Sequence, residues 1–158
     1  MNKLYLLDAY ALIYRAYYAL IQKPRINSKG MNTSAIYGFV NTLEEVRTLF
    51  SPTHLAVAFD PAGKTFRHEM YEPYKAQRQE TPEDIRKSVP VIKDIIRAYN
   101  IPILEVEHYE ADDVIGTAAS RFASADTEVY MLTPDKDYGQ LVGQNIWMLR
   151  PMKGGTFE

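Results

Sequence analysis

The residues best placed to do chemistry in this sequence are carboxylates that follow short apolar runs. Two runs of strand length, residues 3–7 and 54–59, are each followed at once by an aspartate. Acidic residues also follow two later apolar runs within a few positions. The complete set of candidate metal ligands is Asp8, Asp60, Glu110, Asp112, Asp113, Asp135 and Asp137.

Convergence at one edge of a sheet would make these carboxylates a metal site. The carboxyl ends of parallel strands lie at the same edge, where ligands bind. Seven negative groups gathered there repel one another unless a cation lies among them. Oxygen ligands suit Mg²⁺ or Mn²⁺, and two such ions ~4 Å apart serve in-line displacement at phosphorus. The alternative for each acid, taken singly, is a helix cap, a turn residue or a partner of a helix dipole.

Composition removes several other kinds of site. The 158 residues include no cysteine, which excludes disulfides, thiolate zinc sites and cysteine nucleophiles. The three histidines, His54, His68 and His108, form no pair with the spacing of metal ligands. No apolar run approaches the ~20 residues of a membrane span. We therefore expect a cytoplasmic protein with no membrane partner.

A basic segment rich in aromatic residues follows the second predicted strand. Residues 61–81 contain four Lys and Arg side chains among Phe and Tyr rings. Residues 1–97 hold 14 Lys and Arg against 10 Asp and Glu, whereas residues 98–158 hold 4 against 10. Arg and Lys bind phosphate, and tyrosine rings stack on bases. A phosphate-binding segment opposite an acidic metal site is typical of a metal-dependent nuclease, and a solvated charged loop is the alternative.

The elements that must position these residues alternate between strands and helices. Strands are predicted at residues 3–7, 54–59, 101–104, 128–132 and 146–149, and helices at 10–20, 33–51, 82–99 and 111–122. Thr33 and Thr81 are predicted to cap the second and third of these helices. The alternation favours an α/β fold, with a mostly parallel, twisted sheet and helices on both faces. At roughly 150 residues per domain, residues 1–158 form one domain.

Several motifs, standing in this order, resemble those of the 5′-nuclease (flap endonuclease) family. They most resemble the 5′→3′ exonuclease domain at the N terminus of bacterial DNA polymerase I. The EADDVIG and TPDKD elements are specific when they occur together, whereas either alone is weak. The motifs are LLD at 6–8 with RAYYA at 15–19, GMNTSAIYGF at 30–39, FD at 59–60 with FR at 66–67, YKAQR at 74–78, EADDVIG at 110–116 and TPDKD at 133–137.

The resemblance implies a PIN-like domain that removes 5′ flaps and RNA primers from DNA in replication and repair, using two divalent ions. It assigns Asp8, Asp60, Glu110 and Asp112 to the first metal, and Asp113, Asp135 and Asp137 to a place at or near the second. It also implies that Arg15, Arg67, Lys75 and Arg78 bind the DNA.

Among these basic residues, the resemblance places Lys75 at the scissile phosphate and gives Arg67 and Arg15 catalytic roles. Residues 61–81 would form an arch around a single strand. Tyr37 and Phe39 match a family aromatic pair, for which we expect packing roles. We expect a monomer.

One departure from the family leaves other functions open. The family has a second acidic pair and a helix–three-turn–helix element after the sheet, and both are absent before Glu158. The sequence therefore predicts a truncated domain in which the second metal is loosely held or absent. The alternatives are a non-catalytic nucleic-acid-binding fragment and a PIN-type ribonuclease. A Toprim-like phosphotransfer domain fits less well, because Asp8 stands where that fold has Glu.

Overall fold

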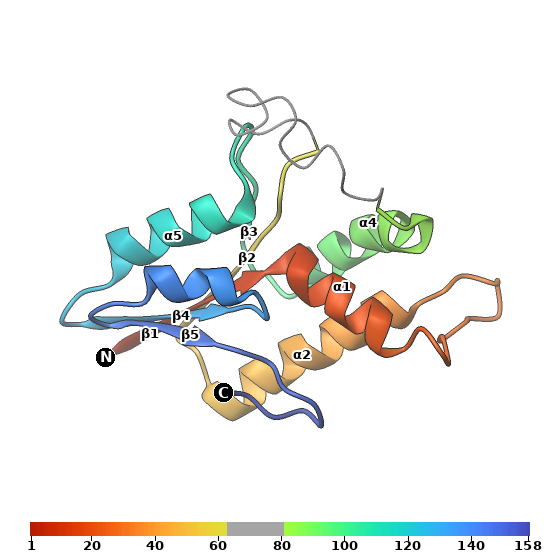
Figure 1. Ribbon diagram of the computed structural model, residues 1–158, viewed down its shortest axis with the longest axis horizontal. Helices are drawn as coiled ribbons and strands as arrows, with labels where there is room; N and C mark the ends of the chain where they lie inside the picture. Colours follow the sequence, from red (N-terminus) through yellow and green to blue (C-terminus); the bar gives the residue numbers. More distant parts are fainter. Residues whose placement is uncertain (63–80) are drawn as a thin grey trace.

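The computed structural model describes residues 1–62 and 81–158 of this chain. Five parallel strands form one sheet in the order β3-β2-β1-β4-β5 (Figure 1). The strands are β1 (Asn2–Asp8), β2 (His54–Ala58), β3 (Ile103–Leu104), β4 (Thr127–Leu132) and β5 (Ile146–Leu149). The helices are α1 (Ala9–Ala19), α2 (Ser34–Phe50), α4 (Glu83–Ala98), α5 (Ala111–Phe122) and the 3₁₀ helix η1 (Lys136–Leu141).

Strand β1 lies at the centre of the sheet and fixes the register of its neighbours. Asp8 is paired with Ala58 of β2, and Leu7 is paired with Leu132 of β4. The residues that follow β1, β2 and β4 therefore leave the sheet at the same edge, as the sequence predicts.

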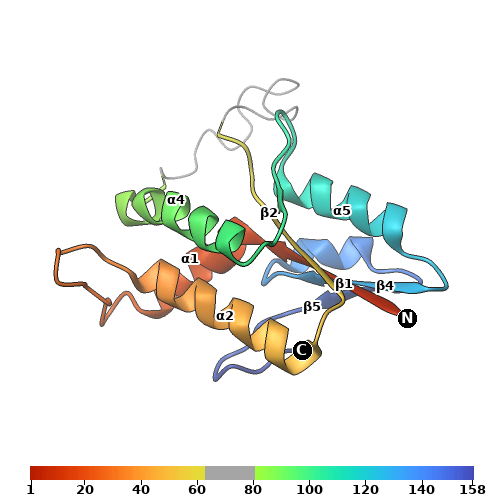
Figure 2. The ribbon, with the colours of Figure 1, turned by 180° about the vertical axis from the view of Figure 1, so that it is seen from behind.

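Helices cover both faces of the sheet, as Figures 1 and 2 show. Tyr5 and Leu7 of β1 point into a core formed with α1, α2 and α4. Leu6, between them, points into the core on the opposite face, which α5 and Tyr138 of η1 complete. This alternation follows from the pleat of the strand, which turns successive side chains to opposite faces. The predicted α/β fold is confirmed.

Two helix starts differ from the sequence prediction. Thr33 is the N-cap residue of α2, but its hydroxyl donates to the carbonyl of Arg25 in the preceding loop and makes no bond to the helix. The amide of Ser34 instead donates to Asn32 Oδ1. The N-cap of α4 is Pro82, one residue after the predicted Thr81, and it has no side-chain capping bond.

Strand β3 is shorter than predicted, and Pro102 explains the difference. Proline has no amide hydrogen, so residue 102 can accept a hydrogen bond but cannot donate one. Its carbonyl accepts from the amide of Val57, and paired strand geometry is limited to Ile103–Leu104.

No described helix is long and apolar enough to cross a membrane.

A close contact between α1 and α2 depends on a glycine. A Cβ atom added at Gly38 would lie 2.4 Å from the Cβ of Ala16, well inside van der Waals contact. Ala16 is buried on α1, so the two helices would have to separate to admit a side chain.

We predict that Gly38→Ala lowers the free energy of unfolding by about 1–3 kcal/mol, the usual cost of overpacking. Urea denaturation followed by circular dichroism measures this change. Gly143→Ala is the matched control, because nothing lies within 4 Å of an added Cβ there. Equal stabilities for the two variants would contradict the packing argument.

Candidate metal centre

A buried aspartate joins the ends of the two central strands. Asp8 is the last residue of β1, and its side chain is 6% exposed. Its Oδ2 accepts a hydrogen bond of 3.0 Å from the hydroxyl of Thr133, the residue directly after β4. The same hydroxyl oxygen accepts a bond of 3.1 Å from the amide of Asp135. One threonine therefore fixes Asp8 and the start of the Asp135 segment relative to each other.

A second aspartate joins the end of β2 to the start of α5. The Oδ1 atom of Asp60 accepts a hydrogen bond of 2.8 Å from the amide of Ala111, the first residue of α5. Figures 1 and 2 show why they meet: the loop that precedes α5 runs beside the segment that follows β2. Asp60 therefore satisfies an amide that has no partner within the helix. Bonding to the start of a helix is one of the structural roles that the sequence allows for an acid. The same bond also fixes the orientation of the Asp60 carboxylate.

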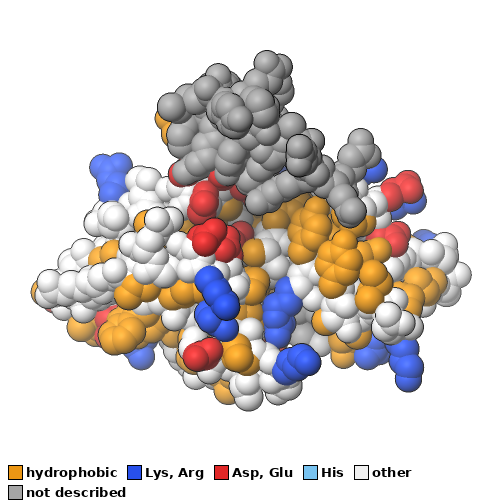
Figure 3. All heavy atoms as spheres, viewed as in Figure 1, with side chains coloured by type: hydrophobic (Ala, Val, Ile, Leu, Met, Phe, Trp, Pro, Cys, Tyr) orange, Lys and Arg blue, Asp and Glu red, His pale blue; other side chains and the backbone are white. Residues whose placement is uncertain are grey.

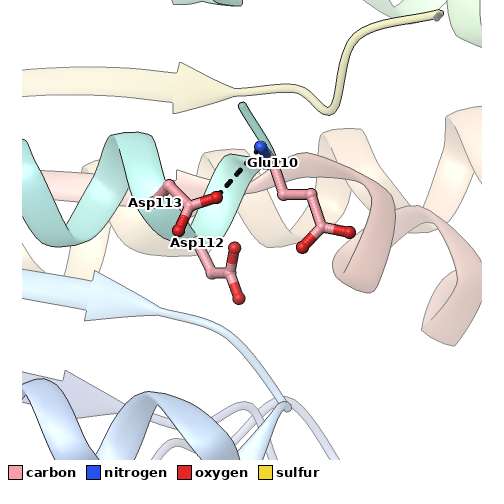
Figure 4. A group of neighbouring side chains, drawn as sticks. All are labelled: Glu110, Asp112 and Asp113. Carbon is pink, nitrogen blue, oxygen red and sulfur yellow. Dashed lines mark hydrogen bonds between the residues drawn. The ribbon is translucent and has the colours of Figure 1, made fainter. Parts of the chain in front are cut away.

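Three acidic residues gather at the N terminus of α5. Glu110, Asp112 and Asp113 each offer an oxygen, and these oxygens lie within 4.8 Å of one another. Glu110 and Asp113 form a capping box, in which Asp113 Oδ2 accepts from the Glu110 amide at 3.2 Å. Figure 4 shows Asp113 turned back toward that amide, while the side chains of Glu110 and Asp112 project from the helix start.

Burial and a neighbouring negative charge raise the pKa of Asp8. Burial raises the pKa of this carboxyl group to about 6, and the Asp60 carboxylate raises it further, whereas the hydroxyls of Thr133 and Tyr138 lower it. The pKa of the Tyr138 phenol is also raised far above its ordinary value, by burial and by Asp8, Asp112 and Asp60. The charges of Asp8, Asp60 and Asp112, which come from three separate elements, therefore all act on one buried hydroxyl.

The donor set fits a hard divalent cation. Every candidate ligand is a carboxylate oxygen, the kind of donor that suits Mg²⁺ and Mn²⁺. A cation would offset both the repulsion among these groups and the burial of Asp8. Figure 3 shows Asp and Glu side chains gathered on this face of the molecule, with Lys and Arg side chains directly below them.

The aspartates that follow β4 lie apart from the close group of three. Asp135 and Asp137 are exposed at the start of η1. Asp135 Oδ1 accepts from the amide of Asp137 at 3.0 Å, which caps the 3₁₀ helix. Both are at the predicted edge of the sheet, but among described residues the only group of three or more potential ligands within 4.8 Å of one another is Glu110, Asp112 and Asp113.

Of the basic residues predicted to bind DNA, only Arg15 is described. It is half-buried on α1, and its Nη2 donates to the carbonyl of Met152 at 3.0 Å. The predictions for Arg67, Lys75 and Arg78 lie outside the described residues.

The aromatic pair on α2 divides into one core residue and one surface residue. Phe39 is buried in the core, as expected. The packing role expected for Tyr37 is wrong: its ring is 44% exposed, and the Arg25 guanidinium lies 4.4 Å from the ring centroid. Helical geometry explains the difference, because residues two apart cannot share a helix face.

The sequence reasoning gave no role to Thr133 or Tyr138. The register contains the signal for Thr133: Leu132 pairs with Leu7, so the residue directly after β4 stands beside Asp8. No comparable signal exists for Tyr138, because its side chain reaches the carboxylates only through the turn of η1.

We predict that Asp8→Asn stabilises the protein in EDTA at neutral pH. In the wild type, the unfolded carboxyl group releases its proton near its ordinary pKa of 3.8, whereas the folded one retains it until about pH 6. The contribution of Asp8 to wild-type stability therefore falls as pH rises through this window. The amide has no charge to bury, so its advantage grows from near zero below about pH 4 to as much as about 3 kcal/mol above pH 6.

Urea unfolding from about pH 4 to about pH 7.5 tests this prediction. Asp126→Asn is the matched control, because Asp126 is an exposed acid before β4, at the opposite edge of the sheet. Its stability curve should run parallel to that of the wild type. An Asp8→Asn curve that also runs parallel would contradict the raised pKa.

Comparisons with known proteins identify the family of this chain. The sequence profile of the family described as "5'-3' exonuclease, N-terminal resolvase-like domain" matches residues 3–157. A 5'-3' exonuclease of Aquifex aeolicus is 41% identical over 157 residues, which are 99% of this chain and 54% of that protein. DNA polymerase I of Geobacillus stearothermophilus is 40% identical over 156 residues, which are 98% of this chain and 18% of the polymerase.

Solved structures show the same fold at low sequence identity. The T5 5'-exonuclease with bound zinc has a TM-score of 0.68 and 18% identity, covering 99% of this chain and 58% of that chain. The catalytic core of Rad2 in complex with a DNA substrate has a TM-score of 0.54 and 17% identity, covering 99% and 47%. This chain thus spans about half, or less, of these proteins. On its sequence and its fold, the chain belongs to the 5′-3′ exonuclease family, as that family's N-terminal resolvase-like domain.

Proposed function

We propose that this chain carries the metal centre of a nuclease that hydrolyses phosphodiester bonds of DNA, acting as a 5′→3′ exonuclease and flap endonuclease. In that role it removes 5′ flaps and RNA primers in replication and repair, as part of a DNA polymerase I or a separate exonuclease. The observation that supports the proposal is that Asp8 and Asp60 stand at the ends of adjacent strands, and that Asp60 bonds to the start of α5, where Glu110, Asp112 and Asp113 lie within 4.8 Å of one another. The lack of cysteine fits a cytoplasmic setting.

The carboxylates would hold two ions, Mg²⁺ or Mn²⁺. Asp8, Asp60, Glu110 and Asp112 would bind the first. Asp113, Asp135 and Asp137 would stand at or near the second. Asp60, Asp113 and Asp135 each have one oxygen bonded to a backbone amide, which orients the other oxygen.

Catalysis would divide between the ions and the side chains of this chain. Bound divalent ions supply the Lewis acidity that activates water and offsets charge at phosphorus. Asp8, fixed by Thr133 and lying next to Asp60, holds its charge at the centre of the sheet edge. Burial of Asp8 and Glu110, 6% and 5% exposed, limits the number of water molecules that compete with the ligands.

The substrate would be held by positive charge beside the acidic centre. Arg15, Arg67, Lys75 and Arg78 would bind DNA phosphates, with Lys75 at the scissile phosphate and Arg67 and Arg15 assisting catalysis. The segment 61–81 would act as the arch around a single strand, and the protein would work as a monomer. For Arg15, the bond to the Met152 carbonyl uses Nη2 and leaves other guanidinium donors for phosphate.

Two other functions can be separated from this one by substrate and by turnover. A PIN-type ribonuclease would cut single-stranded RNA in preference to flap DNA. A non-catalytic module would bind DNA in a salt-dependent manner, since phosphate contacts release counterions, but would not cut it. Incubation of the protein with labelled flap DNA and with single-stranded RNA of equal length, in Mg²⁺ and in Mn²⁺, distinguishes the three.

We predict that millimolar Mn²⁺ raises the melting temperature of this chain, because an ion that binds only the folded state stabilises it by mass action. The gain should correspond to about 1–3 kcal/mol for concentrations well above the dissociation constant. Asp112→Asn should abolish most of the gain, whereas Asp126→Asn, a change to an acid at the far edge, should retain it. An equal gain in the wild type and in Asp112→Asn would contradict the assignment of this metal centre.

We also predict that Asp112→Ala and Asp8→Ala each reduce cleavage of 5′-flap DNA by at least about a hundredfold in the full-length protein, since metal ions contribute several kcal/mol to such reactions. DNA affinity, measured by fluorescence anisotropy in Ca²⁺, should change by less than about threefold, because the phosphate contacts come from the basic residues. Cleavage that survives both substitutions would exclude the proposed mechanism.

A further inference from the structure

A buried tyrosine hydroxyl lies inside the acidic centre, close to the Asp8 carboxylate. Tyr138 lies on η1 and is 2% exposed, and its ring packs in the core beneath α5. Its hydroxyl oxygen is enclosed and forms no well-formed hydrogen bond with a described residue. A buried hydroxyl without a partner costs free energy, so its presence calls for an explanation.

The Asp8 carboxylate lies close enough to this hydroxyl to accept its hydrogen bond. Asp8 comes from β1, Asp112 from α5, and Asp60 from the segment after β2, and all three raise the pKa of the Tyr138 phenol. A phenol keeps its proton at neutral pH. Ionised carboxylates can only accept hydrogen bonds, and a protonated phenol can donate to any of them.

The inference rests on the function proposed above and concerns the same site. We propose that Tyr138 is a positioning residue of this metal centre: its phenolic O–H donates to the Asp8 carboxylate when a divalent cation is bound, and so directs the remaining lone pairs of the Asp8 oxygens toward the ion.

A neutral donor suits this position better than a cationic one would. A Lys or Arg among these acids would neutralise them and so compete with the divalent ion, whereas a phenol orders a carboxylate without cancelling its charge. Thr133 already donates to Asp8 Oδ2. With Tyr138, the segment after β4 would supply two hydroxyl donors to one ligand, and the same segment carries Asp135 and Asp137.

The test compares Mn²⁺ binding by the wild type, Tyr138→Phe and Tyr130→Phe, using isothermal titration calorimetry. Tyr130 is the matched control, because its hydroxyl donates to Glu128 within β4, before the strand reaches the acidic edge. We expect Tyr138→Phe to bind Mn²⁺ about tenfold more weakly, the size of one hydrogen bond to a charged group. Tyr130→Phe should bind as the wild type does.

Melting temperatures separate positioning from packing. In EDTA, Tyr138→Phe should melt at the same temperature as the wild type or higher, because a buried hydroxyl that forms no well-formed hydrogen bond is removed. In saturating Mn²⁺ it should melt lower. A substitution that affects only packing would give the same difference in both conditions, and that result would overturn the proposal.

A measurement on the unmodified protein covers the case in which Tyr138→Phe folds poorly. In a sample with ¹³C-labelled tyrosine rings, Mg²⁺ should shift the Tyr138 resonance and leave that of Tyr130 in place. Equal Mn²⁺ affinity for wild type and Tyr138→Phe, or an unmoved Tyr138 resonance in a protein that binds the ion, would overturn the role of Tyr138 alone. If the wild type binds no Mn²⁺, and Asp112→Asn behaves identically, the proposed function fails as well.

Discussion

Repulsion among carboxylates at one edge of a parallel sheet is the constraint on which the rest of this structure depends. Asp8 and Asp60 follow adjacent strands, and the register brings their backbones to the same edge. The chain reduces the repulsion by bonding single oxygens to fixed donors: Thr133 for Asp8 and the Ala111 amide for Asp60. Each bond also joins two elements that are distant in sequence. The contacts that lower the electrostatic cost therefore also fix the geometry of the site.

The sequence was sufficient to predict the sheet and the location of the acids. Short apolar runs ending in Asp8 and Asp60 are a local signal, and the covalent order of strands and helices leaves few topologies available. The helix starts were less predictable. Threonine at position 33 is a favourable cap by type, yet its hydroxyl bonds to Arg25 of the preceding loop. Whether a hydroxyl turns toward the helix or the loop depends on tertiary contacts that no local pattern contains.

In the structure, one acidic residue can have both a structural role and a ligand role. Asp113 is a capping residue and also a member of the group of three potential ligands. A carboxylate has two oxygens, so one can bond to a backbone amide while the other faces an ion. Sequence spacing identifies the residue but says nothing about its separate oxygens. The two interpretations therefore had to stay open until hydrogen-bond geometry was known.

The packing of α5 in the core allows its first turn to carry acids that serve both roles. Ala111 and Ile115 are buried beneath the sheet face that carries Leu6, which anchors the helix independently of its acids. The first turn can then carry Asp112 and Asp113 at little cost, because negative charge near a helix N terminus interacts favourably with the helix dipole. Packing of the apolar face and the dipole of the same helix together hold the carboxylates in place before an ion binds. Because these ligands are ordered in advance, less of the binding free energy of a cation is lost to ordering side chains.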